Sequence, residues 1–142
     1  MLVDTILQTK GVVVHTLPET ATLTDAVATL NAHNIGAVVV TNAGGTIIGI
    51  LSERDIVRQL GRNPSGALAL PVGQCMTRGV VTCSRDTGIA EVMERMTRLR
   101  IRHMPVAEDN RLVGIVSIGD VVKHKIEEAE HEAEVLREYI AS

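Results

Sequence analysis

The feature that most constrains this chain is an internal repeat, because the same order of apolar segments and turns occurs twice within 142 residues. The two copies cover residues 13–60 and 79–123. Each copy opens with a run of β-branched residues, at 11–16 and 78–83, which predicts a short strand. A duplicated chain of this length is expected to form one domain from two similar units.

Each copy continues with the pattern of one helix and two further strands. Apolar residues recur at helical spacing, at Leu23, Val27 and Leu30 in the first copy and at Ile89, Val92, Met93 and Met96 in the second. Two apolar runs separated by turn residues follow, IGAVVV and TIIGIL in the first copy and IRHMPV and LVGIVS in the second. A second helix is expected to begin near Ser52 and near Ser117. Two such units can cover each other's apolar surface, so we expect an α/β (α+β) fold of two βαββα units related by a pseudo-two-fold axis.

The most specific motif is Gly-apolar-x-Ser-x-x-Asp, which occurs once per copy at residues 49–55 and 114–120. It falls where a strand is expected to lead into a helix. A Ser hydroxyl and free N–H groups at a helix start can bind an anion, and a carboxylate one turn later can accept both hydroxyls of a ribose. Ser-x-x-Asp also fits a capping box, in which the acid only supports the helix start. Repetition in register favours the binding interpretation.

Together these strings resemble a known family. They are KGVVVHTLPETATLTDAVATL, IGAVVV and GILSERDIVR in the first copy, and CMTRGVVTCSRDT, IRHMPV and GIVSIGD in the second. Both copies resemble CBS motifs, and the pair resembles a Bateman module from about Thr5 to Lys125. We expect CBS motif 1 at 5–62, a linker at 63–74, CBS motif 2 at 75–125 and a C-terminal helix at 126–142. The resemblance implies regulatory binding of AMP, ADP, ATP, NAD(H) or a related adenosine ligand such as S-adenosylmethionine, which would sense energy or redox state.

The resemblance also implies which residues contact the ligand. In that family the Asp of the motif holds the ribose and the nearby Ser meets phosphate. The second copy carries Arg102 and His103, similar to the cations that contact phosphates in nucleotide-binding members, whereas IGAVVV in the first copy has no cation. We therefore expect one better site, with Arg54 and Lys10 as helpers; an exposed edge-strand pair is the alternative for Arg102 and His103. The expected ligand contacts are Lys10, Val14, Ala37, Ser52, Arg54, Asp55, Thr77, Val80, Arg102, His103, Met104, Pro105, Ser117 and Asp120.

Composition argues against several other functions. The chain has one Tyr, no Phe or Trp and a net charge of -3, which does not suit nucleic-acid binding by stacking and a basic groove. No HExxH or Cys/His metal spacing occurs, so we expect no metal, no catalytic cofactor and no enzyme activity. Cys75 and Cys83 do not form a CxxC pair, and the apolar runs are only as long as strands. These features predict a cytoplasmic protein without a membrane segment.

The C-terminal segment predicts an amphipathic helix. Its apolar residues alternate steps of four and three, at Val122, Ile126, Ala129, Ala133, Leu136 and Ile140. We expect this helix to pack on its own domain or on a twin subunit. The resemblance to CBS pairs, which commonly associate into dimers, implies a homodimer that acts on an unidentified regulated protein. The alternative function is a structural or protein-interaction CBS module with no physiological nucleotide ligand.

Overall fold

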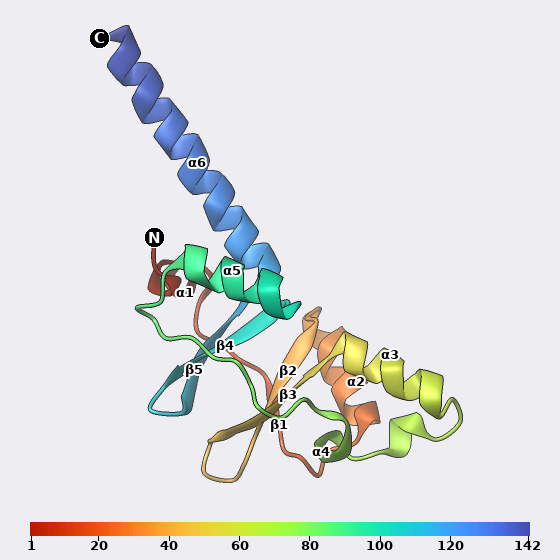
Figure 1. Cartoon of the computed structure of the whole chain (residues 1–142). Coiled ribbons are helices and arrows are strands. Elements are labelled where there is room, and N and C mark those ends of the chain that lie inside the picture. The colour runs from red at the N-terminus through yellow and green to blue at the C-terminus, as the bar shows by residue number, and fades with distance from the viewer.

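The computed structural model describes residues 1–142 and shows two packed halves that correspond to the two sequence copies (Figure 1). Its helices and strands are α1 Val3–Lys10, β1 Thr16–Leu17, α2 Leu23–His33, β2 Ala37–Thr41, β3 Ile47–Ser52, α3 Glu53–Arg62, the short 3₁₀ helix η1 Ala67–Ala69, α4 Val72–Cys75, α5 Ile89–Leu99, β4 His103–Glu108, β5 Arg111–Ser117 and α6 Ile118–Ala141. This mixed α+β architecture confirms the expected fold class. The connection expected at 63–74 carries η1 and the start of α4, and Ala67 within it is buried.

The first half is a three-stranded sheet with α2 and α3 packed on it. β2 lies in the middle, parallel to β1 and antiparallel to β3. The first four residues of β2 are all buried, whereas buried and half-buried residues alternate along β3. α2 begins at a capping box, because the Asp25 N–H donates to the Thr22 hydroxyl and the Thr22 N–H donates to the Asp25 carboxylate. The helix then buries Leu23, Ala26 and Leu30.

The second half pairs β4 with β5 in antiparallel fashion and packs α5 and α6 against them. The opening strands expected at 11–16 and 78–83 were largely wrong. Only Thr16–Leu17 forms a strand in the first copy, and a single bridge joins Cys83 to Val106 in the second. The rest of each segment crosses between the halves, where no neighbouring strand runs beside it (Figure 1).

The apolar interior consists of two clusters, one in each half. The cluster of the first half includes Leu23 and Leu51. The cluster of the second half also takes in Val3, Ile6 and Leu7 of α1, although this helix comes first in the chain. The N-terminal helix, which the sequence interpretation missed, therefore belongs to the second half. The spacing of these three residues is its only signal in the sequence.

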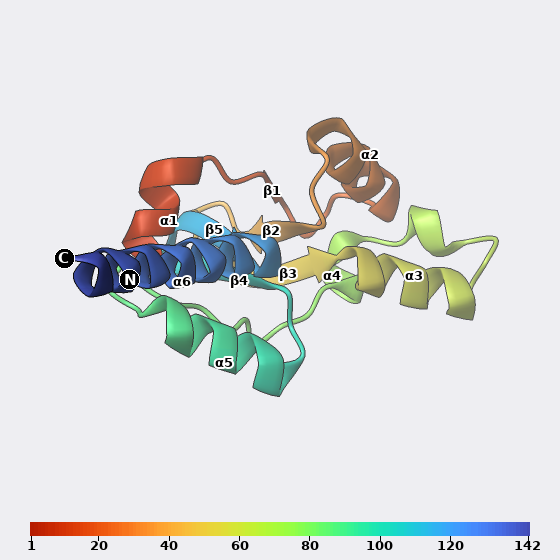
Figure 2. The same cartoon turned by 90° about the horizontal axis from the view of Figure 1, so that it is seen from above.

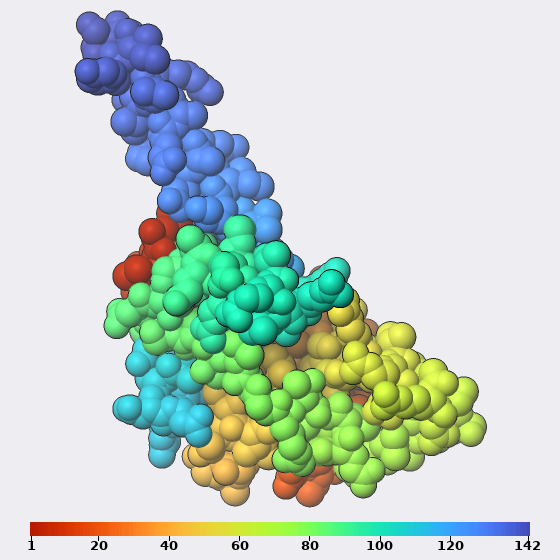
Figure 3. Space-filling model, in the orientation of Figure 1, coloured from red at the N-terminus to blue at the C-terminus, as the bar shows by residue number.

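The second helix of copy two and the C-terminal amphipathic segment form one continuous helix, α6, of 24 residues. Seen from above, it starts between α1 and α5 (Figure 2). Val121 and His124 are buried against the second half, but the helix beyond Lys125 projects from the body (Figures 1 and 3). No helix combines the length and the apolar character that a membrane crossing requires.

Candidate functional site

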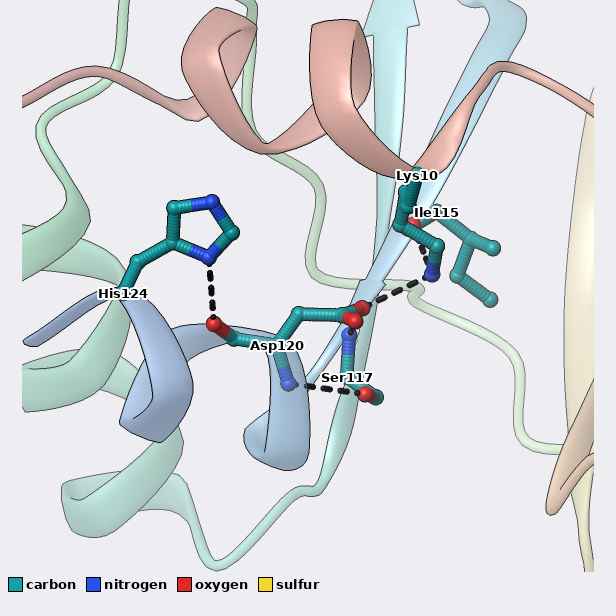
Figure 4. A network of polar contacts seen from close by, with 5 residues as sticks. All are labelled: Lys10, Ile115, Ser117, Asp120 and His124. Atoms are coloured by element: carbon teal, nitrogen blue, oxygen red, sulfur yellow. Dashed lines mark hydrogen bonds and ion pairs between the residues drawn. The ribbon is translucent and has the colours of Figure 1, made fainter. Parts of the chain in front are cut away.

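The corner between β5 and α6 holds Asp120 in a network of polar contacts (Figure 4). The Ser117 N–H donates to Asp120 Oδ2 at 2.9 Å, and the Asp120 N–H donates to Ser117 Oγ at 3.2 Å. Lys10 Nζ donates to the same Oδ2 at 2.7 Å and to the Ile115 carbonyl at 3.1 Å. Asp120 Oδ1 accepts no hydrogen bond from the chain. This corner is a capping box that still offers one carboxylate oxygen to an outside donor.

The charge on Asp120 follows from these contacts. Burial raises the pKa of its carboxyl, but the hydrogen bonds from Lys10 and Ser117 and the positive charge of Lys10 outweigh burial, so the pKa lies below its usual range. The side chain is 23% exposed. Asp120 is therefore an accessible, charged acceptor at neutral pH.

The matching corner between β3 and α3 differs. The N–H and the hydroxyl of Ser52 both donate to Asp55 Oδ2, at 2.9 and 3.1 Å, and Arg58 Nη1 contacts Oδ1 at 3.4 Å. The Asp55 side chain is only 9% exposed. Both of its oxygens are engaged, so the two copies of the motif are not equivalent.

A cavity of about 340 Å³ opens beside the Asp120 corner. It lies between the two halves and combines aliphatic side chains with a few polar groups. Its lining residues are Lys10, Val13, Val14, His15, Asn34, Ile35, Gly36, Ala37, His103, Ile115 and Ser117. The His15 ring stacks on that of His33, with centroids 3.5 Å apart and planes 12° apart. Aliphatic walls with few polar groups suit a flat, uncharged ring.

A second cavity of about 290 Å³ shares Gly36 and His103 with the first. No apolar side chain lines it; the other lining residues are Ser52, Glu53, Arg54, Arg100 and Arg102. Ser52 is the N-cap of α3, so the cavity also lies at the positive end of a helix. Three guanidinium groups against one carboxylate make this space suitable for a phosphate.

His103 and Gly36 lie where the two cavities adjoin, because both residues line each cavity. A Cβ on Gly36 would lie 2.8 Å from Glu53 Oε1 and 3.1 Å from the His103 ring, so a side chain here would require both to move. Burial lowers the pKa of His103; the charges of Glu53 and Asp120 raise it, and those of Lys10 and Arg102 lower it. The balance keeps the imidazole largely neutral at pH 7.

The structure brings most of the expected site residues together. Those that line the first cavity are Lys10, Val14, Ala37, His103 and Ser117, and those that line the second are Ser52, Arg54, Arg102 and His103. Asp120 lies beside the first cavity through its ion pair with Lys10.

Besides Asp120, five expected residues line neither cavity: Asp55, Thr77, Val80, Met104 and Pro105. Met104 and Pro105 are buried in β4, and Thr77 exchanges backbone hydrogen bonds with Ile50 of β3. Met104, Pro105 and Thr77 therefore stabilise the fold rather than line a cavity.

Sequence reasoning missed Arg100, His15 and Asn34. Arg100 ends α5 in the left-handed conformation at φ 55°, which places a third guanidinium beside the second cavity. Its only sequence signal is the alternation Arg98-x-Arg100-x-Arg102. Nothing in the spacing of His15 and His33 indicated that their rings would stack.

Comparison with known proteins places this geometry in a family. The model of the CBS domain matches residues 7–62 and 72–127. The chain belongs to the CBS-domain family. It is a pair of CBS domains, a regulatory module, and stand-alone CBS-domain proteins are generally regulatory rather than catalytic.

Individual CBS proteins are similar over most of the chain. A CBS-domain-containing protein of Agrobacterium tumefaciens is 44% identical, with a TM-score of 0.85, over 87% of this chain and 92% of that one. The mitochondrial CBS domain-containing protein CBSX3 of Arabidopsis thaliana is 37% identical over 84% of this chain and 60% of its own length. The first three curated relatives are matched over 54% to 66% of their length.

One structural neighbour contains ligands. The CBS domain pair of protein MJ0100 was solved in complex with 5-methylthioadenosine and S-adenosyl-L-methionine. It is 27% identical to this chain, with a TM-score of 0.81, over 90% of this chain and 98% of that one.

Proposed function

We propose that this CBS pair binds one adenine nucleotide, AMP, ADP, ATP or NAD(H), across the two adjoining cavities. The purine lies among Val14, Ile35 and Ala37, the ribose donates to Asp120 Oδ1, and the phosphates extend past His103 toward the arginines. The observation that carries the proposal is that an aliphatic cavity and a cationic cavity adjoin, because both are lined by Gly36 and His103.

The charges favour a phosphorylated ligand over an uncharged nucleoside. Arg54, Arg100 and Arg102 line the second cavity against the single carboxylate of Glu53. Charge-assisted hydrogen bonds to phosphate contribute roughly 1.5 to 3 kcal/mol each. The adenosine ligands of the MJ0100 CBS pair support the nucleoside part of the proposal.

Binding has a regulatory consequence because both halves line the first cavity. Ala37 belongs to β2 of the first half and Ser117 to β5 of the second. A ligand between them favours one relative orientation of the halves, and a partner protein reads that orientation. The ligand level thereby reports energy or redox state.

Calorimetry tests the proposal with AMP, ATP, NADH, S-adenosylmethionine and adenosine. We expect one ligand per chain, since Asp55 is fully engaged and Asp120 is not. Asp120→Ala should weaken AMP and adenosine alike, by tenfold or more, because both carry the ribose. Arg102→Ala should weaken AMP by tenfold but adenosine by less than threefold. Arg98→Ala, which removes a cation paired with Glu94 on the surface of α5, is the matched control.

A second candidate function is a structural or interaction module with no nucleotide ligand. The observation in its favour is that both Ser-x-x-Asp corners form capping boxes, so each carboxylate already supports a helix. Absence of heat with all five compounds would favour this candidate, and AMP binding unchanged in Asp120→Ala would reject the proposed ribose contact.

A further inference from the structure

The projecting part of α6 carries an apolar stripe that nothing in the chain covers. Ile126, Leu136 and Ile140 are 53% to 74% exposed, and Val122 nearer the body is also exposed. Most residues on the other faces of the helix are charged or small, apart from the exposed Val135 and Tyr139, so the stripe is a narrow seam of the kind that packs against another helix.

The body of the protein leaves this seam open. Val121 and His124 mark the side of α6 that packs on the second half. At 100° per residue the seam lies about 130° around the helix from that side, more than a third of a turn. Gly119 and Val122, at the base of α6, are themselves exposed. A second helix can therefore lie against the seam from Gly119 onward without meeting the side of α6 that packs on the second half.

We propose that the seam packs against the same seam of a second copy of this chain, with the two α6 helices antiparallel and Ile126 opposite Ala129 of the other copy. This register matches large residues with small ones. Val122 then faces Ala133, and Leu136 faces Gly119. Because each bulky side chain fills the space beside a small one, the helix axes can approach closely along the whole overlap.

The charges fit the same register. Lys123 and Lys125 flank the seam near the base of α6, and Glu130 and Glu132 flank it one to two turns later. With Ile126 opposite Ala129, Lys123 faces Glu130 on one side of the seam and Lys125 faces Glu132 on the other. Two-fold symmetry repeats both contacts. Within one chain Lys125 only approaches Glu128 at 3.8 Å, so it can reach a better partner.

A parallel pair of α6 helices fits less well. It would place Ala129 and Ala133 opposite their own copies in two successive layers, which leaves a gap between the larger layers. It would also bring the glutamate-rich middle of each helix beside the other. In that arrangement Lys123 has no acidic partner and Arg137 faces Glu132. Lys123 and Arg137 therefore distinguish the two orientations.

Sedimentation equilibrium of the full chain tests the proposal through charge reversal. Lys123→Glu should raise the dissociation constant of the dimer at least tenfold, whereas Arg137→Glu, the matched control, should change it less than twofold. Glu130→Lys alone should also weaken association, and an equimolar mixture of Lys123→Glu with Glu130→Lys should recover it. A monomeric wild-type chain, no effect of Lys123→Glu, or equal effects of the two reversals overturns the proposal.

Disulfide trapping tests the register directly. A mixture of Ile126→Cys and Ala129→Cys chains should form a cross-linked heterodimer under mild oxidation, and each variant alone should cross-link much less. The wild-type chain is the control, because Cys75 and Cys83 are buried. Efficient cross-linking of each variant with itself indicates parallel helices and contradicts the proposal.

Discussion

At the scale of single residues, His103 is the group whose charge should respond to the ligand. It lies where the two cavities meet, and burial holds its pKa below the ordinary value of about 6.5. A phosphate placed beside it would favour the imidazolium form and raise that pKa. Binding of AMP should therefore take up a proton, and the affinity should rise several-fold as the pH falls from about 7.5 to 6.

Calorimetry in buffers of different ionisation enthalpy measures this proton uptake. His103→Gln should abolish it, and adenosine, which has no phosphate, should show little in either protein. In the ligand-free protein, folding stability depends on pH in the opposite direction from AMP affinity. Because the folded state disfavours the charged imidazole, its contribution to stability is present above pH 6.5 and declines as the pH falls below that value. A wild-type affinity for AMP with the same pH profile as His103→Gln would contradict this role.

The two aspartates show what a motif can and cannot predict. Both corners could be located from Ser-x-x-Asp, and both formed the capping box that the same pattern allows. The difference between them could not be predicted, because it depends on Arg58 and Lys10, which lie outside the motif. Arg58 and Ser52 engage both oxygens of Asp55, whereas Lys10, 110 residues away, engages only one oxygen of Asp120.

At the scale of elements, the glycine that opens each Gly-apolar-x-Ser-x-x-Asp motif leaves room for a side chain from another segment, Met76 at Gly49 and Leu7 at Gly114. A Cβ on Gly49 of β3 would overlap the sulfur of Met76, which follows α4. We expect Gly49→Ala to destabilise the fold by about 1 to 3 kcal/mol through overpacking. Gly61→Ala in α3 is the matched control, since nothing lies within 4 Å of its Cβ position and a helical alanine is favoured by up to about 1 kcal/mol.

Denaturant unfolding of both variants measures these changes. In a Met76→Ala background the cost of Gly49→Ala should largely disappear, because the overlapping atoms are gone. An unchanged cost in that background would show that strain in the strand, rather than Met76, makes glycine necessary.

Elements with their own periodic signal were predictable, and elements that depend on a neighbour were not. The spacing of Leu23, Val27 and Leu30 fixed a helix that the structure contains. The β-branched runs at 11–16 and 78–83 looked like strands by composition, but a strand also needs a partner in register, and these segments mostly lack one.

At the scale of the whole molecule, α1 joins the start of the chain to the second half. Leu7 is buried in the second apolar cluster and lies against Gly114 of β5. Leu7→Ala should cost about 2 to 5 kcal/mol. Because the two clusters are separate, the loss should appear first as faster hydrogen exchange of β4 and β5. Leu51→Ala, in the apolar cluster of the first half, should instead give faster hydrogen exchange first in β2 and β3.

A ligand between the halves changes this expectation, since Ala37 of the first half and Ser117 of the second half line the same cavity. Saturating AMP should protect the amides of both halves and reduce the difference that Leu7→Ala creates. The measurement is hydrogen exchange by mass spectrometry, with and without AMP, on both variants. Equal loss of protection in the two halves of ligand-free Leu7→Ala would mean that they unfold as one unit, so the regulatory signal could not come from a change in how tightly they are coupled.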